Sequence, residues 1–274
     1  MSLQDRIDLT FQRLADEARA GLVTFITAGD PDPETSQQLM ERLPGAGADI
    51  IELGMPFSDP MADGPAIQAA NLRALSSGAS LRGTLAMVSR FREKNNDTPV
   101  ILMGYFNPIY QYGQSRFVTD AAAAGVDGLI MVDLPPEEDD ELCDPARTAG
   151  LHWVRLVAPT SDEVRLQQVL RNTSGFIYYV SIAGITGTRS AAVSAIGDAL
   201  AMIRKHTALP IAVGFGINTA DQVRETGEVA DGAVVGSAII REIENHLDGS
   251  GKAKPELLDR VTGLVSELAR GLRA

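Results

Sequence analysis

Short apolar runs recur along the chain, and most of them end in glycine, proline, aspartate or asparagine. Nearly continuous apolar runs of this length predict buried strands of a parallel sheet. Between them lie segments with helix-start signals, such as Asp32-Pro33-Glu34 and Ser161-Asp162-Glu163. The predicted strands are residues 22–28, 49–54, 99–105, 126–132, 152–158, 176–181, 210–214 and 232–236.

Eight such strand–helix units predict an α/β fold, a single (β/α)₈ TIM barrel that takes residues 1–274 as one domain. An open doubly wound sheet is the alternative, but it requires edge strands and usually has fewer repeats. Two additions to a minimal barrel are expected. Residues 2–19 form an extra amphipathic helix with Ile7, Phe11 and Leu14 on one side, which we expect to cover the barrel bottom. The long connection after the second strand holds two helices, at 66–78 and 80–94.

Charge and composition exclude several classes of protein. The net charge of −12 argues against a nucleic-acid or acidic-membrane partner, so any anionic ligand must be held locally. The N-terminal segment is charged throughout, and no apolar run reaches the ~18 residues of a membrane span. A lone cysteine, Cys143, is typical of a cytoplasmic protein without disulfides. The acidic run at 137–141 is interpreted as a solvated surface turn.

Glycines follow the sixth, seventh and eighth predicted strands, within "SIAGITG", "GFGIN" and "GSAII". The active site of a TIM barrel lies at these strand ends, and the loops after strands seven and eight often bind phosphate. Glycine lets backbone N–H groups approach an anion closely without a lysine or arginine. Three such strand ends predict a phosphate site. Gly214-x-Gly216 lacks the third glycine of a dinucleotide fingerprint.

Two carboxylates mark the second strand and its loop. Glu52 lies in the apolar run, and no basic residue that could pair with it occurs between Arg42 and Arg73. Burial at the end of a strand should raise the pKa of Glu52, whereas Asp63, in a polar loop, should stay ionised. Two acids of unlike pKa suit acid–base chemistry on a neutral carbon skeleton that carries a phosphate. A purely structural pair is the alternative.

Other reactive residues give weaker signals. His152, His206 and His246 lie away from the predicted strand ends, so we expect neither a metal site nor a histidine-centred triad. No lysine is placed for a Schiff base. Tyr105 and Tyr178 lie at strand ends and either line a pocket for a flat apolar group or pack in the core.

The segment "IELGMPFSDPMADGP" resembles the signature of the tryptophan synthase α subunit family. "VTFITAGDPD", "ILMGYFNPI", "GLIMVDLPPEE", "YYVSIAGITGTR", "VGFGI" and "GSAII" resemble the same family in the same order, across residues 20–240. The resemblance implies a barrel that cleaves indole-3-glycerol phosphate to indole and glyceraldehyde 3-phosphate by a retro-aldol reaction.

The resemblance also implies roles for individual residues. Glu52 matches the acid–base group that protonates indole C3, Asp63 the acid at the indole N–H, and Tyr178 a tyrosine beside the bond that breaks. Substrate-binding positions are matched by Tyr105, Thr186, Gly187, Phe215, Gly216, Gly236 and Ser237.

Members of this family work as an α₂β₂ complex in which indole passes through a tunnel to the β subunit. The resemblance therefore implies a β partner, contacted by the segment with Pro56, Asp59 and Pro60. It implies no cofactor in this chain, since pyridoxal phosphate belongs to the β subunit. Three alternatives stay open: a free-standing lyase, a sugar-phosphate isomerase or epimerase barrel, and a silent allosteric partner. Intact Glu52 and Asp63 argue against the last.

Overall fold

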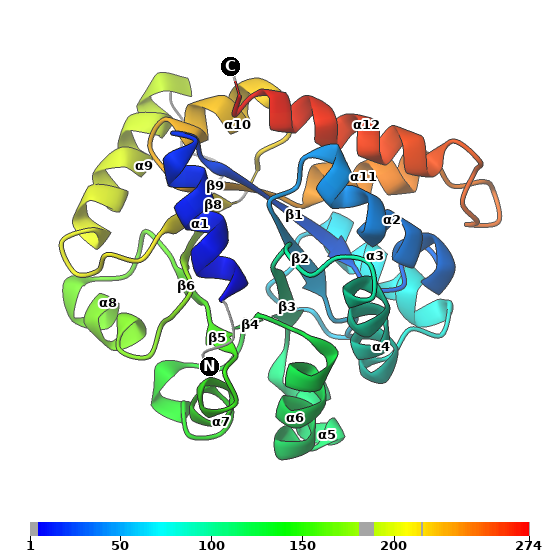
Figure 1. Ribbon diagram of the computed structural model, residues 1–274, viewed down its shortest axis with the longest axis horizontal. Helices are drawn as coiled ribbons and strands as arrows, with labels where there is room; N and C mark the ends of the chain where they lie inside the picture. Colours follow the sequence, from blue (N-terminus) through cyan, green and yellow to red (C-terminus); the bar gives the residue numbers. More distant parts are fainter. Residues whose placement is uncertain (1–4, 181–188, 215, 274) are drawn as a thin grey trace.

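The strands of the protein close into a barrel surrounded by helices (Figure 1). A computed structural model describes residues 5–180, 189–214 and 216–273. Within these ranges nine parallel strands pair in the order β5-β4-β3-β2-β1-β9-β8-β7-β6. They are β1 (Gly21–Thr27), β2 (Ile50–Gly54), β3 (Val100–Gly104), β4 (Gly128–Met131), β5 (His152–Trp153), β6 (Arg155–Val157), β7 (Ile177–Val180), β8 (Ile211–Gly214) and β9 (Gly232–Val235).

The predicted barrel is confirmed, with one correction at its fifth strand. The predicted strand 152–158 is divided into β5 and β6, because β5 pairs with β4 whereas β6 pairs with β7. Val154 joins them, and its N–H donates to the carbonyl of Leu129 at 2.9 Å. The two ends of the sheet are therefore consecutive in the chain, and this junction closes the barrel.

Helices cover the outside of the barrel and confirm the predicted pair between β2 and β3. Asp32 and Asp162 accept backbone N–H groups as N-caps of α2 and α8, as their sequence signals predict. No helix in the described ranges is long and apolar enough to cross a membrane. The helices are α1 (Arg6–Asp16), α2 (Pro33–Ala46), α3 (Pro65–Ser76), α4 (Leu81–Arg92), α5 (Phe106–Tyr112), α6 (Gln114–Ala124), α7 (Cys143–Thr148), α8 (Glu163–Leu170), α9 (Arg189–Ile203), α10 (Ala220–Gly227), α11 (Ser237–Asn245) and α12 (Leu257–Arg270), with a 3₁₀ turn η1 (Pro136–Glu138).

Helix α1 covers the N-terminal end of the barrel, as predicted. Ile7, Phe11 and Leu14 are buried in one cluster with residues of the barrel strands, and the rings of Phe11 and Phe176 lie 5.8 Å apart. Figure 1 shows α1 in blue, lying across the strands. This end of the barrel is therefore filled by apolar side chains, which leaves the opposite end for a site.

Three aspartates clasp neighbouring strands together at the N-terminal end. Each one precedes its strand, donates its own N–H to a residue of the adjacent strand at 2.9 Å and accepts the N–H of that same residue with its carboxylate at 2.7–2.9 Å. Each carboxylate also pairs with at least one arginine. We call these residues the clasp aspartates; with their strand partners they are Asp49–Leu22, Asp127–Val100 and Asp231–Ile211.

The alternation of strand side chains points Glu52 into the barrel. Ile50 belongs to the interior cluster beneath α1, and residues two apart on a strand face the same side. Glu52 therefore faces the interior one step nearer the C-terminal end. Phe25 of β1 is its partner in register.

Candidate active site

Glu52 is a buried carboxyl without a partner. The residue is 1% exposed, and neither of its carboxyl oxygens has a hydrogen-bond partner among the described residues. Burial raises the pKa of Glu52 to about 8, as the sequence predicts. The carboxyl is therefore mostly protonated at neutral pH, which spares the fold a buried charge and leaves a proton to donate.

Asp63 lies in the loop after β2, where a turn bond from its N–H to the carbonyl of Pro60 at 3.0 Å holds the backbone. Its carboxylate accepts hydrogen bonds from Tyr105 and, at 3.4 Å, from the side-chain amide of Asn71. Burial raises the pKa of Asp63 to about 6, and the two hydrogen bonds oppose that rise. Asp63 is thus ionised at neutral pH as expected, although its pKa is not that of an exposed loop residue.

Asn71 holds the loop that carries Asp63, and sequence reasoning missed it. It is 4% exposed and accepts the N–H of Phe57 at 3.2 Å, while its amide reaches Asp63 and the carbonyl of Ile67. One side chain of α3 thereby ties both ends of the loop. The sequence does contain a signal for it: Asn71 is a polar residue next to Ala70 and Ala74, on the face of α3 that is buried.

The two predicted tyrosines both face the acids. The Tyr105 hydroxyl accepts the N–H of Ala62 at 3.0 Å, and burial together with the charge of Asp63 raises the pKa of Tyr105 to about 12. Burial raises the pKa of Tyr178 well above its ordinary value, and the charges of Glu52 and Asp63 add to the rise. Both hydroxyls therefore stay protonated, and Tyr178 lies within electrostatic reach of both acids.

Gly214, at the end of β8, makes room for Tyr178. A Cβ atom at this position would lie 2.6 Å from the Cε1 and Cζ atoms of the Tyr178 ring. In the sequence, Gly214 belongs to the glycine pattern at the strand ends. The steric contact with Tyr178 is a second requirement that the sequence alone does not reveal, because the two residues belong to different strands.

The glycine-lined strand ends lie on the same side of the barrel as the two acids. Gly236 takes the N-cap position of α11 without a side-chain cap, and Ser237 begins that helix. A Cβ at Gly236 would lie 3.2 Å from the Cβ of Phe25, the register partner of Glu52. Gly216 has a left-handed φ of +79°, which glycine adopts without strain. An uncapped helix start beside glycine is a suitable cradle for a phosphate group.

Three predicted substrate-binding residues, Thr186, Gly187 and Phe215, lie outside the described residues, so their positions stay predictions. The predicted partner segment is described. Within it Asp59 is exposed and Pro56 is buried, and the neighbouring Met61 is 81% exposed.

The described residues also include the three histidines and the acidic run 137–141. Among residues 5–180, 189–214 and 216–273, no group of three or more metal-ligating side chains gathers. His152 pairs with Asp5 at the start of β5. The interpretation of 137–141 as a solvated turn is wrong at Asp139, which is buried because Arg155 and Asn172 bind its carboxylate.

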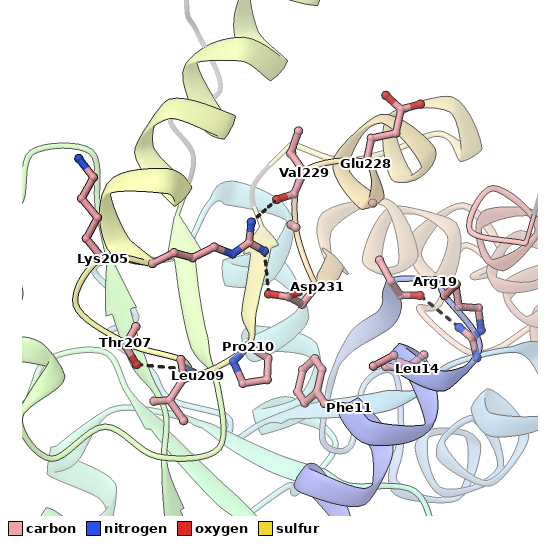
Figure 2. Close-up of a pocket in the computed structure, with 17 residues that line it drawn as sticks. Phe11, Leu14, Arg19, Lys205, Thr207, Leu209, Pro210, Glu228, Val229 and Asp231 are labelled. Carbon is pink, nitrogen blue, oxygen red and sulfur yellow. Dashed lines mark hydrogen bonds and ion pairs between the residues drawn. The ribbon is translucent and has the colours of Figure 1, made fainter.

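A groove of about 940 Å³ lies at the opposite end of the molecule, between α1 and the segments that lead into β8 and β9. Arg204 donates to the carbonyl of Val229 at 3.2 Å and to the carboxylate of Asp231 at 3.0 Å. Both acceptors are labelled in the close-up of this groove (Figure 2). Arg19 donates to the carbonyl of Ala20 at 3.2 Å. Both arginines here are thus engaged in structural contacts, and the unpaired acid lies at the other end of the barrel.

Comparison with known proteins gives consistent matches. A family model described as tryptophan synthase alpha chain matches residues 11–269. The crystal structure of tryptophan synthase subunit alpha from Legionella pneumophila is 39% identical, with a TM-score of 0.90 over 99% of each chain. An open form of tryptophan synthase from Mycobacterium tuberculosis is 32% identical, with a TM-score of 0.87 over 98% of this chain and 99% of that one. A structure from Aquifex aeolicus is 35% identical, with a TM-score of 0.87 over 99% of this chain and 100% of that one.

Proposed function

The chain belongs to the tryptophan synthase alpha chain family, whose members are lyases that cleave indole-3-glycerol phosphate, and from this premise we propose a retro-aldol cleavage carried by Glu52 and Asp63. The products are indole and glyceraldehyde 3-phosphate. The observation that carries the proposal is the buried carboxyl of Glu52, which has no hydrogen-bond partner among the described residues and whose pKa of about 8 lies above the pKa of about 6 of Asp63.

Glu52 moves the proton. As a protonated acid it donates to indole C3, which becomes tetrahedral and so loses its place in the aromatic system. The bond from C3 to the glycerol side chain then breaks, and its electrons restore the ring. The side-chain hydroxyl loses its proton to the Glu52 carboxylate as the aldehyde forms, so the acid returns to its starting state. General acid–base catalysis of this kind contributes about 10²–10⁴-fold in rate.

Asp63 stabilises charge. Protonation at C3 places positive charge on the indole nitrogen, and a fixed carboxylate at that nitrogen lowers the barrier electrostatically. The hydrogen bonds from Asn71 and Tyr105 hold this carboxylate in one orientation, so little reorganisation is needed when the charge develops. Tyr178, on which the charges of both acids act, is proposed to form the wall of the site next to the reacting carbon.

The phosphate is held by backbone N–H groups. Gly216, Gly236 and Ser237, at the ends of β8 and β9, supply the close approach and the uncapped helix start. Thr186, Gly187 and Phe215, which follow β7 and β8 in the chain, are proposed as further substrate-binding residues from the resemblance alone. The chain has a net charge of −12, so it does not attract an anion at long range. A phosphate must therefore be bound by local contacts, which the uncharged backbone N–H groups provide.

A β subunit is the proposed partner. The two kinds of chain form an α₂β₂ complex, in which the β subunit receives indole through a tunnel. The exposed Asp59, with Pro56 and Pro60, forms the proposed contact segment. We place pyridoxal phosphate in the β subunit alone and the complex in the cytoplasm. Turnover by the purified chain, measured with and without added β subunit, separates this partner-dependent enzyme from a free-standing lyase.

The test of the proposed function is Glu52→Gln, which keeps the shape of the side chain and removes its proton. We expect indole formation to fall about 10²–10⁴-fold while substrate affinity, measured by calorimetry, changes little. Unchanged turnover would refute the role of Glu52. Binding of glyceraldehyde 3-phosphate without competition from indole analogues would instead favour a sugar-phosphate isomerase or epimerase.

A further inference from the structure

A buried arginine lies on strand β6, outside the proposed active site. Arg155 is 5% exposed, and its guanidinium lies 5.2 Å from the centre of the Trp153 ring. Its Nη1 donates to the carbonyl of Leu134 at 2.6 Å and its Nη2 pairs with Asp139, whose other oxygen accepts from Asn172 at 2.8 Å. Burial lowers the pKa of Arg155 to about 10, so the guanidinium is still charged at neutral pH.

Stability alone gives a weak reason for such a pair. Desolvation of two charges is costly, and apolar residues of similar volume often do as well. What the pair does achieve is a fixed position for the loop after β4, because both acceptors, Leu134 and Asp139, belong to that loop. Arg155 thereby fastens residues 133–139 to strand β6.

The fastened loop leads directly to the proposed active site. Asp133 precedes Leu134, and its carboxylate accepts the N–H of Phe106 at 2.8 Å, at the first residue of α5. The preceding residue, Tyr105, accepts the N–H of Ala62 and donates to Asp63. A continuous path of direct contacts therefore runs from Arg155 through two loops to the acid that stabilises charge.

We propose that Arg155 and Asp139 are positioning residues for the cleavage reaction, which hold the loop 133–139 so that Asp133 and Tyr105 keep Asp63 in its working place. The inference rests on the proposed function, because Asp63 receives its role there. It adds two residues that touch neither substrate nor reacting atoms.

The first test is Arg155→Met, which keeps the length of the side chain and removes its donors. We expect kcat for indole formation to fall about 10–100-fold, since displacements of about 1 Å have effects of this size. KM should stay within about twofold, because the phosphate cradle lies on β8 and β9. The matched control is Arg165→Met, which breaks an exposed pair with Glu137 of the same loop and should change neither constant.

The pH profile separates positioning from general damage. Loss of the Tyr105 hydrogen bond should raise the pKa of Asp63 above about 6, so the acid limb of the kcat profile should move to higher pH in Arg155→Met. The double variant Arg155→Met with Asp139→Leu removes the unpaired charge and should recover the wild-type Tm without recovering kcat. Recovery of kcat together with Tm would overturn the proposal.

A readout without activity keeps the two proposals apart. In Arg155→Met the amide NMR signals of Ala62 and Phe106 should shift, because each amide donates to a group on the proposed path. Unchanged signals would overturn the positioning role. A wild-type chain that forms no indole would overturn the proposed function, whereas the amide signals would still test the path.

Discussion

Strand β2 and the residue before it carry two buried carboxyls, three positions apart, whose properties are opposite. Asp49 precedes the strand and is 7% exposed; Glu52 lies within it and is 1% exposed. Burial alone would raise the pKa of both, but hydrogen bonds from Arg19, Arg13 and the N–H of Leu22 outweigh burial and lower the pKa of Asp49. Glu52 has no such partner in the part of the chain that the structure describes, and burial raises its pKa to about 8. Partners, rather than depth, therefore decide whether a buried acid stabilises this barrel or is available for chemistry.

Removal of the paired acid should have the largest effect. Asp49→Ala leaves Arg19 with only the more exposed carboxylate of Glu17 and leaves the N–H of Leu22 without its side-chain acceptor. We expect the free energy of unfolding to fall by about 3–5 kcal/mol, as for other broken buried pairs. Urea unfolding measures this loss, and Asp259→Ala is the control, because its pair with Arg42 is exposed and worth under about 1 kcal/mol. A loss no larger than the control would contradict the contrast drawn above.

Removal of the unpaired acid should act in the opposite direction. Because the pKa of Glu52 is raised in the folded state, the unfolded chain loses this proton at lower pH, and stability should decline from about pH 4.5 to about pH 8. Glu52→Gln should abolish this decline and gain roughly 4 kcal/mol at pH 8. Unfolding curves of both proteins at pH 5 and pH 8 measure it. Equal pH dependence in the two proteins would show that Glu52 is not protonated in the fold.

The smallest of the three effects on stability should come from a steric clash at Gly214, rather than from a change of charge. Gly214→Ala should push the Tyr178 ring away from the two acids and lower kcat about 10–100-fold, at a cost to stability of about 1–3 kcal/mol from overpacking. Steady-state kinetics of indole formation measure the change. Gly249→Ala is the control, because a Cβ there meets no atom within 4 Å. Full activity in Gly214→Ala would mean that the ring position is not critical.

The sequence predicted what depends on local pattern. Apolar runs placed the strands, and the position of Glu52 in a buried apolar run predicted its raised pKa. What it missed depends on residues remote in the chain. The division of β5 from β6 follows from their different neighbours, and the burial of Asp139 follows from Arg155 on another element.

The proposed site divides in the same way. Glu52, Asp63, Tyr105 and Tyr178 were identified from strand-end positions and from resemblance, and the structure brings them together. Asn71 and the second role of Gly214 were missed, because each acts by contact with a side chain of a different element. The raised pKa of Asp63 was missed for a related reason, since loop burial is set by the residues that fold over it.

Each clasp aspartate joins two strands that follow one another in the chain, so every clasp closes a single β–α–β crossover at its base. Three pairs of consecutive strands, β1–β2, β3–β4 and β8–β9, are thus each held together by contacts within their own segment of the chain. A cut near Gly78, in the exposed turn between α3 and α4, would leave all three clasps intact within one fragment or the other. The first fragment would keep the clasp between β1 and β2, and the second would keep the other two. Strand pairs that stay joined within each fragment would favour reassembly of a split enzyme from two separately produced halves.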